Sequence, residues 1–254
     1  MSDFKLIDLV KGTIQARSPS VWLAFNGGLL DRSQYMTSSE AGNCERMIWF
    51  DKNTEEKPAT THEWGFFERG HSVERWVTDQ LKASNDNSVK YTMMGEDQRS
   101  FHSGYQSGTP DGLASTSEGV TVLEFKSIDP RTNIKNLPKP NHIAQCIQNM
   151  DLVMECMPEL NILGAKLLYI NASDFTKMYE FEVEYDIEAA MVLEKKAEKI
   201  MEAGLADELE PWGIFNNGCT YCKHTSKCSA VVEQKQIEAS AYAALGEVAK
   251  GVFK

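Results

Sequence analysis

Apolar residues recur along the chain at spacings that predict helices and strands in alternation. From residue 64 to residue 81 they return every three or four positions, which is typical of a helix. The helix has two neighbouring stripes: Trp64, Phe67, His71, Glu74 and Thr78 on one, and Phe66, Val73, Val77 and Leu81 on the other. Three shorter segments with β-type composition follow at residues 89–94, 101–115 and 120–128.

The second half of the pattern adds one helix, two strands and a further helix. A helix is predicted over residues 138–157, a buried strand over 162–173 and an alternating outer strand over 177–185. An amphipathic helix then runs from Ile187 to about residue 204. This order predicts an α/β fold in which a mixed central sheet is flanked by helices.

The two ends of the chain differ from this regular middle part. Residues 1–60 are expected to form an irregular arm with short helices, one of them capped by Ser38 or Ser39. Residues 206–254 contain a group of cysteines and an alanine-rich helix. We therefore divide the chain into an arm at 1–60, a core at 61–205 and a C-terminal segment at 206–254.

Composition and charge narrow the classes of protein that fit. The chain has 254 residues, 42% of them hydrophobic, and can bury a substantial core. It has no apolar run of the roughly 18 residues that a membrane span needs, and its N-terminus lacks a signal-peptide pattern. We expect a cytoplasmic protein, in the host cytoplasm if it is virus-encoded, with no membrane partner.

The net charge of −11 argues against a protein that coats nucleic acid by neutralising phosphates. The charge is unevenly distributed, however. Residues 130–142 contain Arg131, Lys135 and Lys139 and no acidic residue. Because a local basic strip can act on an acidic protein, these three are candidate DNA contacts. Three aromatic residues are candidates to stack on bases, although core packing is the commoner role: Tyr105, Trp212 and Phe215.

A carboxylate and a lysine share one face of the strand predicted at 120–128. Glu124 and Lys126 are two residues apart, whereas Leu123 and Phe125 point to the other face. If the preceding β segment forms a hairpin with this strand, Asp111 lies beside Glu124. Two carboxylates that meet repel each other, and a divalent cation with oxygen ligands relieves the repulsion.

This arrangement suits phosphodiester hydrolysis. A cation such as Mg²⁺ or Mn²⁺, held by Asp111 and Glu124, polarises the phosphoryl oxygens and lowers the pKa of an attacking water. Lys126 would orient the water and offset the charge that develops in the transition state.

These residues resemble the PD-(D/E)xK nuclease superfamily. Pro110-Asp111 and Glu124-Phe125-Lys126 occupy the signature positions. The resemblance implies a restriction-endonuclease-like fold, with the backbone carbonyl of Phe125 as a further metal ligand. His71 is similar to the helix histidine that the RecB-like branch uses as a ligand. Gln145 is similar to the glutamine of its QxxxY motif, which positions the substrate or the lysine, but Asn149 stands where the tyrosine is usual.

Four of the six cysteines suggest a metal site. Cys219, Cys222 and Cys228 form a C-x2-C-x5-C group, and Cys44 lies far upstream. Four thiolates are the right number for zinc or for an iron–sulfur cluster, and the spacing alone does not choose between them. A disulfide framework is not expected in a cytosolic protein of this size.

A lone cysteine before the core and a compact trio after it resemble the iron–sulfur nucleases of the RecB-like group, which include CRISPR-associated exonucleases and the nuclease domains of AddAB-type helicase–nucleases. The likeness spans about residues 40–230 and includes Cys44-Glu45-Arg46. It implies that the four thiolates hold a 4Fe-4S cluster in a subdomain built from both ends of the chain. Zinc remains the alternative, with His224 as a spare ligand.

The sequence therefore predicts a metal-dependent deoxyribonuclease, acting as an exonuclease on single-stranded or free DNA ends in recombination, repair or replication. Two alternatives stay open. One is an accessory protein of a larger complex, such as CRISPR spacer acquisition or a helicase–nuclease, with structural zinc. The other is a nuclease that acts on RNA. No G-x4-GK[ST] motif occurs, so any motor would be another chain.

Overall fold

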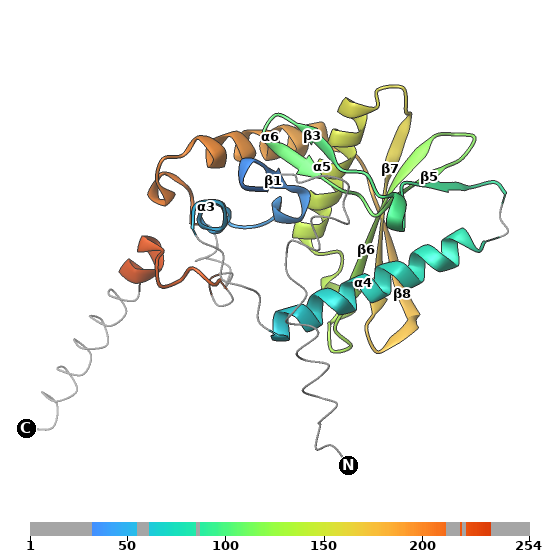
Figure 1. Cartoon of the computed structure of the whole chain (residues 1–254), viewed down its shortest axis with the longest axis horizontal. Coiled ribbons are helices and arrows are strands. Elements are labelled where there is room, and N and C mark those ends of the chain that lie inside the picture. Colours follow the sequence, from blue (N-terminus) through green and yellow to red (C-terminus); the bar gives the residue numbers. More distant parts are fainter. Residues whose placement is uncertain (1–31, 55–60, 85–86, 212–218, 220–221, 235–254) are drawn as a thin grey trace, which may run out of the picture.

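A five-stranded mixed sheet forms the centre of the molecule (Figure 1). The structure is a computed structural model, and it describes residues 32–54, 61–84, 87–211, 219 and 222–234. The strand order is β2-β5-β6-β7-β8, in which β6 and β7 run parallel and the other pairs antiparallel. The strands are β2 (Lys90–Thr92), β5 (Gly112–Ser115), β6 (Val120–Ile128), β7 (Ile162–Asn171) and β8 (Asp174–Val183).

Helices cover both faces of this sheet, as the sequence predicts. Helix α4 (Thr61–Lys82) packs Val73 and Val77 against Leu123 and Phe125 of β6. On the opposite face, α5 (Pro140–Cys156) packs against alternate residues of β6 and β7. Helix α6 (Ile187–Glu202) lies beside α5 and begins at Asp186, whose side chain accepts a hydrogen bond from the backbone N–H of Ala189 at 3.0 Å. The predicted mixed sheet with flanking helices is confirmed.

The β segment predicted at residues 101–115 is divided between the central sheet and a second, three-stranded sheet. That segment contains β3 (Phe101–Ser103), β4 (Gln106–Gly108) and β5. Gly104, at a φ of +50°, lies in the tight turn between β3 and β4, and Pro110 separates β4 from β5. The small sheet has the order β1-β4-β3, with β1 (Met36–Thr37) parallel to β4.

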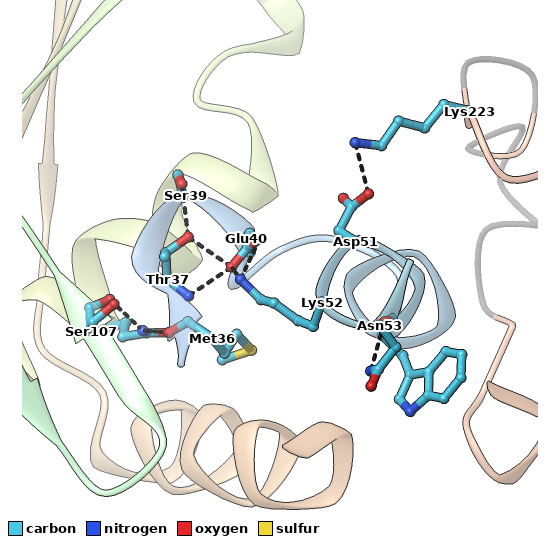
Figure 2. A network of polar contacts seen from close by, with 11 residues as sticks. Met36, Thr37, Ser39, Glu40, Asp51, Lys52, Asn53, Ser107 and Lys223 are labelled. Carbon is cyan, nitrogen blue, oxygen red and sulfur yellow. Dashed lines mark hydrogen bonds and ion pairs between the residues drawn. The ribbon is translucent and has the colours of Figure 1, made fainter. Parts of the chain in front are cut away.

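The arm before α4 packs against the end of α6. It contains the single-turn helices η1 (Arg32–Gln34) and η2 (Ser38–Glu40), followed by α3 (Glu45–Asn53). The expected cap at Ser38 or Ser39 is wrong, because both lie within η2 and Cys44 is the residue before α3. Figure 2 shows the polar contacts of this region, including the ion pair from Lys52 on α3 to Glu40, at 2.8 Å.

Three further single-turn helices are η3 (Gly95–Asp97), η4 (Ile134–Asn136) and η5 (Ala206–Glu208). Within the described ranges, no helix combines the length and the apolar composition that crossing a membrane requires. The alanine-rich helix predicted near the C-terminus lies outside the described residues, and so do Trp212 and Phe215.

Candidate active site and cysteine cavity

The candidate active site lies where β5 separates from β6. Their pairing ends at Gly112 and Leu123, and Asp111 lies beside the edge of β6 just beyond this last pair. The backbone N–H of Asp111 donates to the Leu123 carbonyl at 3.0 Å, and Asp111 Oδ2 accepts from the Phe125 N–H at 2.6 Å. Carbonyls two residues apart in a strand face the same edge, so the Phe125 carbonyl is directed toward the edge where Asp111 lies.

Glu124 and Lys126 lie on the face of β6 that α5 covers. The Glu124 side chain is only 1% exposed, and its Oε1 lies 2.5 Å from Lys126 Nζ. Its other oxygen, Oε2, accepts a hydrogen bond from Asn149 Nδ2 of α5 at 3.1 Å. Both oxygens of this buried carboxylate therefore have a partner within the protein, as burial requires.

The site carries more negative charge than burial favours. Burial raises the pKa of Asp111 well above its usual value, and the carboxylates of Glu124 and Glu74 raise it further. Burial also raises the pKa of Glu124, with Lys126 opposing the shift. For Lys126, burial disfavours the charged form, but Glu124 and Asp111 outweigh it and the pKa rises. A divalent cation would relieve this excess of negative charge.

Helix α4 brings a third carboxylate that the sequence analysis did not select. Glu74 Oε1 accepts a hydrogen bond from Gln98 Nε2 at 2.8 Å, and the same nitrogen lies 3.4 Å from Asp111 Oδ1. The predicted ligand His71 lies one turn earlier, with Nδ1 3.7 Å from Glu74 Oε2. Glu74 could have been selected from the sequence, because it lies three residues after His71 on the same side of the helix. No sequence pattern points to Gln98.

The donor chemistry of this group fits Mg²⁺ or Mn²⁺. Carboxylate oxygens and a backbone carbonyl are the ligands that these hard cations prefer. In the part of the chain that the structure describes, no three histidine, cysteine or acidic side chains are already assembled around one metal position. Lys126 and Gln98 instead hold the carboxylate oxygens of Glu124, Glu74 and Asp111.

Of the two α5 residues in the family motif, Asn149 contacts the candidate active site, and Gln145 has no such contact among the described residues. Both side chains are buried, but the contact with Glu124 comes from Asn149, the residue at the unusual position of the motif. The Oδ1 atom of Asn149 is buried and has no hydrogen-bond partner among the described residues. The sequence analysis noted this position only as a departure from the family pattern.

The three candidate DNA contacts follow β6, in different settings. Arg131 is exposed, and its guanidinium donates two hydrogen bonds to the Asp129 carboxylate, at 2.8 and 2.9 Å. Lys135 lies exposed in η4, and Lys139 precedes α5. Burial lowers the pKa of the nearby His142 to about 3, and the charges of Lys126 and Lys139 add to the shift.

The four predicted thiolates line one cavity of about 110 Å³ at the other end of the molecule. Cys44 comes from the start of α3, and the other three come from the C-terminal segment. Burial raises the pKa of Cys219, and the neighbouring thiols Cys44, Cys222 and Cys228 raise it further. Four sulfur donors around one cavity fit a tetrathiolate group, although they are not drawn together at metal-binding distances.

Polar contacts connect both sides of this cavity. Arg46 donates from Nε to the Leu209 carbonyl at 2.7 Å and from Nη1 to Ser229 Oγ at 2.9 Å. Asp51 Oδ1 lies 2.6 Å from His224 Nε2 and 2.7 Å from Lys223 Nζ, and Figure 2 shows the contact with Lys223. Asp51 engages only Nε2 of His224, and His224 also lines the cavity, so this contact does not choose between four sulfur donors and a site that includes the histidine.

Comparison with known proteins shows similarity in fold. No family model and no curated protein matches the chain. Among 20 similar solved chains, one described as SSO0001 has a TM-score of 0.54 at 14% identity, covering 88% of this chain and 97% of the other. This similarity concerns the fold alone. An alkaline exonuclease (LHK-Exo) from Laribacter hongkongensis has a TM-score of 0.48 at 16% identity, covering 72% of this chain and 90% of its own. Its complex with dAMP gives 0.49, at 16% identity, with 78% and 98% covered.

Proposed function

We propose that this protein is a divalent-metal-dependent deoxyribonuclease of the PD-(D/E)xK type, acting as an exonuclease on single-stranded or free DNA ends. The observation that carries the proposal is the buried cluster of Asp111, Glu124 and Lys126 at the open edge of β6. A lysine and two carboxylates at a strand edge suit hydrolysis of a phosphodiester, whose transition state gains negative charge.

Each residue has a role that its contacts support. Asp111, Glu124 and the Phe125 carbonyl would hold Mg²⁺ or Mn²⁺, with His71 and Glu74 on the α4 side. The bound cation would polarise the phosphoryl oxygen and make an attacking water more acidic. Lys126, released from Glu124, would orient that water and stabilise the developing charge. Asn149 would keep the Glu124 carboxylate in position through its hydrogen bond.

The cysteine cavity would have a structural role in this proposal. Cys44, Cys219, Cys222 and Cys228 would hold a 4Fe-4S cluster that joins α3 to the C-terminal segment. Hydrolysis needs no electron transfer, so the cluster would contribute free energy of folding. The pathway that we favour is DNA recombination or repair, which requires processing of free ends.

End-labelled single- and double-stranded DNA and a circular single strand, incubated with Mg²⁺ or Mn²⁺, test the proposal. Asp111→Asn and Lys126→Met should each lower kcat about 100-fold or more, because each removes part of the charge arrangement that the transition state needs. Degradation of linear strands while circles stay intact would identify an exonuclease.

Lys166→Met is the matched control. Lys166 also forms a strand lysine–glutamate pair, 2.7 Å from Glu180 Oε1, but on an exposed surface. This variant should keep wild-type activity. Wild-type activity in Asp111→Asn, with its folding checked by thermal melting, would refute the assigned chemistry.

A further inference from the structure

The stripe of α4 that faces the candidate active site continues beyond the residues assigned to it. Phe67, His71 and Glu74 are four and three residues apart and therefore follow one side of the helix. Glu74 is connected to Asp111 through Gln98, which fixes this stripe as the one that faces the site. Phe67 lies one turn, about 6 Å, beyond His71 along the helix axis.

The stripe becomes more exposed from the site toward Phe67. The side chains of Glu74 and His71 are 24% and 32% exposed, and Phe67 is 49% exposed. The rings of Phe67 and the buried Trp64 form a T-shaped contact, with the ring centroids 5.7 Å apart, and this is the only ring contact of Phe67 in the described part of the chain. A rigid helix and a buried neighbour thus hold an aromatic ring partly in water, next to a charged site.

The ring lies one helix turn beyond His71, on the stripe of α4 that faces the site. Phosphates at the site would lie between Lys126 on β6 and His71 on α4. A base attached to such a phosphate and directed along α4 would next meet the exposed ring of Phe67. A base of a single strand can turn a face toward a protein ring, whereas a base inside a duplex has both faces covered by the neighbouring base pairs.

We propose that Phe67 is a platform on which an unpaired base stacks when its strand is bound at the Asp111–Glu124 site. This inference rests on the proposed function and deepens it, because it makes the site select single-stranded ends. Stacking accepts every base, so the platform selects for strandedness and not for sequence.

The chain contains a matched control in the adjacent residue. Phe66 is 46% exposed, almost the same as Phe67, but it lies about 100° around the helix and packs beneath the Arg69 guanidinium, 4.9 Å from the ring centroid. Phe66→Ala removes the same side chain from the same helix turn, away from the stripe that faces the site. A general effect of lost aromatic surface would appear in both variants.

Binding of fluorescent single-stranded oligonucleotides and blunt duplexes tests the platform, with every variant in an Asp111→Asn background so that DNA is not degraded. Phe67→Ala should weaken single-strand binding about five- to hundredfold, the range for loss of one stacked base. Phe67→Trp should retain binding, Phe67→Leu should not, and Phe66→Ala should change it less than about twofold. Duplex binding and melting temperature should stay the same in all four.

An abasic scan sharpens the test. When one base at a time is removed from the oligonucleotide, the wild-type protein should bind more weakly at one abasic position. The Phe67→Ala protein should bind that abasic oligonucleotide as well as the intact one. Equal binding by the Phe67→Ala and Phe66→Ala proteins would overturn the inference but leave the proposed nuclease standing. Absence of DNA binding by the Asp111→Asn protein, together with absence of DNA degradation by the wild-type protein, would overturn both.

Discussion

The candidate active site and the cysteine cavity differ in what surrounds their ionisable side chains. In the active site, protein groups already hold the carboxylates: Lys126 and Asn149 contact Glu124, and the Phe125 N–H contacts Asp111. In the cavity, burial raises the pKa of Cys219, and the neighbouring thiols Cys44, Cys222 and Cys228 raise it further. We expect the first site to fold without its cation, and the second to depend for its stability on the group that we propose it binds.

The two regions also differ in the length of chain that they join. Asp111, Glu124 and Lys126 come from one hairpin, so local pairing is enough to bring them together. Cys44 and Cys219 lie at opposite ends of the core, and a group bound between them closes a long loop. A metal at the hairpin should therefore govern activity, whereas a metal at the cysteines should govern stability.

The largest expected effect is on the cysteine side. Cys219→Ser should abolish the iron content and brown colour of anaerobically purified protein. It should also lower Tm by about 10 °C or more, because the bound cluster contributes to folding. Iron analysis and thermal melting measure both. Cys156→Ser, which changes an exposed thiol outside the cavity, should alter neither. A Cys219→Ser protein with normal Tm and metal content would contradict the contrast between the two sites.

A smaller effect should appear when pH and divalent metal are varied together. Folded Asp111 and Glu124 retain protons that the unfolded chain releases near pH 4, because their pKa values are raised. Stability without divalent metal should therefore fall as pH rises from about 5 to 8, by roughly 5 °C in Tm. Mn²⁺ should restore it, more strongly at pH 8 than at pH 5.

Asp111→Asn separates this effect from general pH dependence. The variant should melt with a flatter pH profile and gain little from Mn²⁺, whereas Asp174→Asn, at an exposed turn, should keep the wild-type slope. Identical pH profiles for the wild-type and Asp111→Asn proteins would show that the buried carboxylates do not titrate as described.

The smallest effect sharpens the identity of the cysteine site. His224→Asn removes the contact with Asp51 and the stacking of His224 on Phe50, so Tm should fall by about 3 °C. Iron content should stay at the wild-type level, since four sulfur donors remain. A loss of bound metal equal to that of Cys219→Ser, with zinc in the wild-type protein, would instead identify His224 as a ligand.

The parts of the site that depend on local pattern could be predicted from the sequence. Alternation along β6 placed Glu124 and Lys126 on one face and Leu123 and Phe125 on the other, as the structure has them. The hairpin that brings Asp111 beside this strand was also predictable, because strand composition and turn residues are local features.

Contacts that depend on tertiary packing could not be predicted. Gln98 reaches Glu74 and Asp111 from the loop after η3, and no spacing in the sequence connects these three residues. The split of residues 101–115 into two sheets depends on the pairing of β4 with the distant β1. The sequence places Glu74 on a stripe of the helix. That this stripe faces the candidate active site follows only from the packing of Val73 and Val77 against the sheet.

Diffraction from a crystal soaked in Mn²⁺ tests the central claim most directly. The account predicts an anomalous peak bounded by Asp111, Glu124 and the Phe125 carbonyl, with Lys126 Nζ moved away from Glu124. A structure with no manganese there, in which Lys126 still pairs with Glu124 at saturating Mn²⁺, would contradict it.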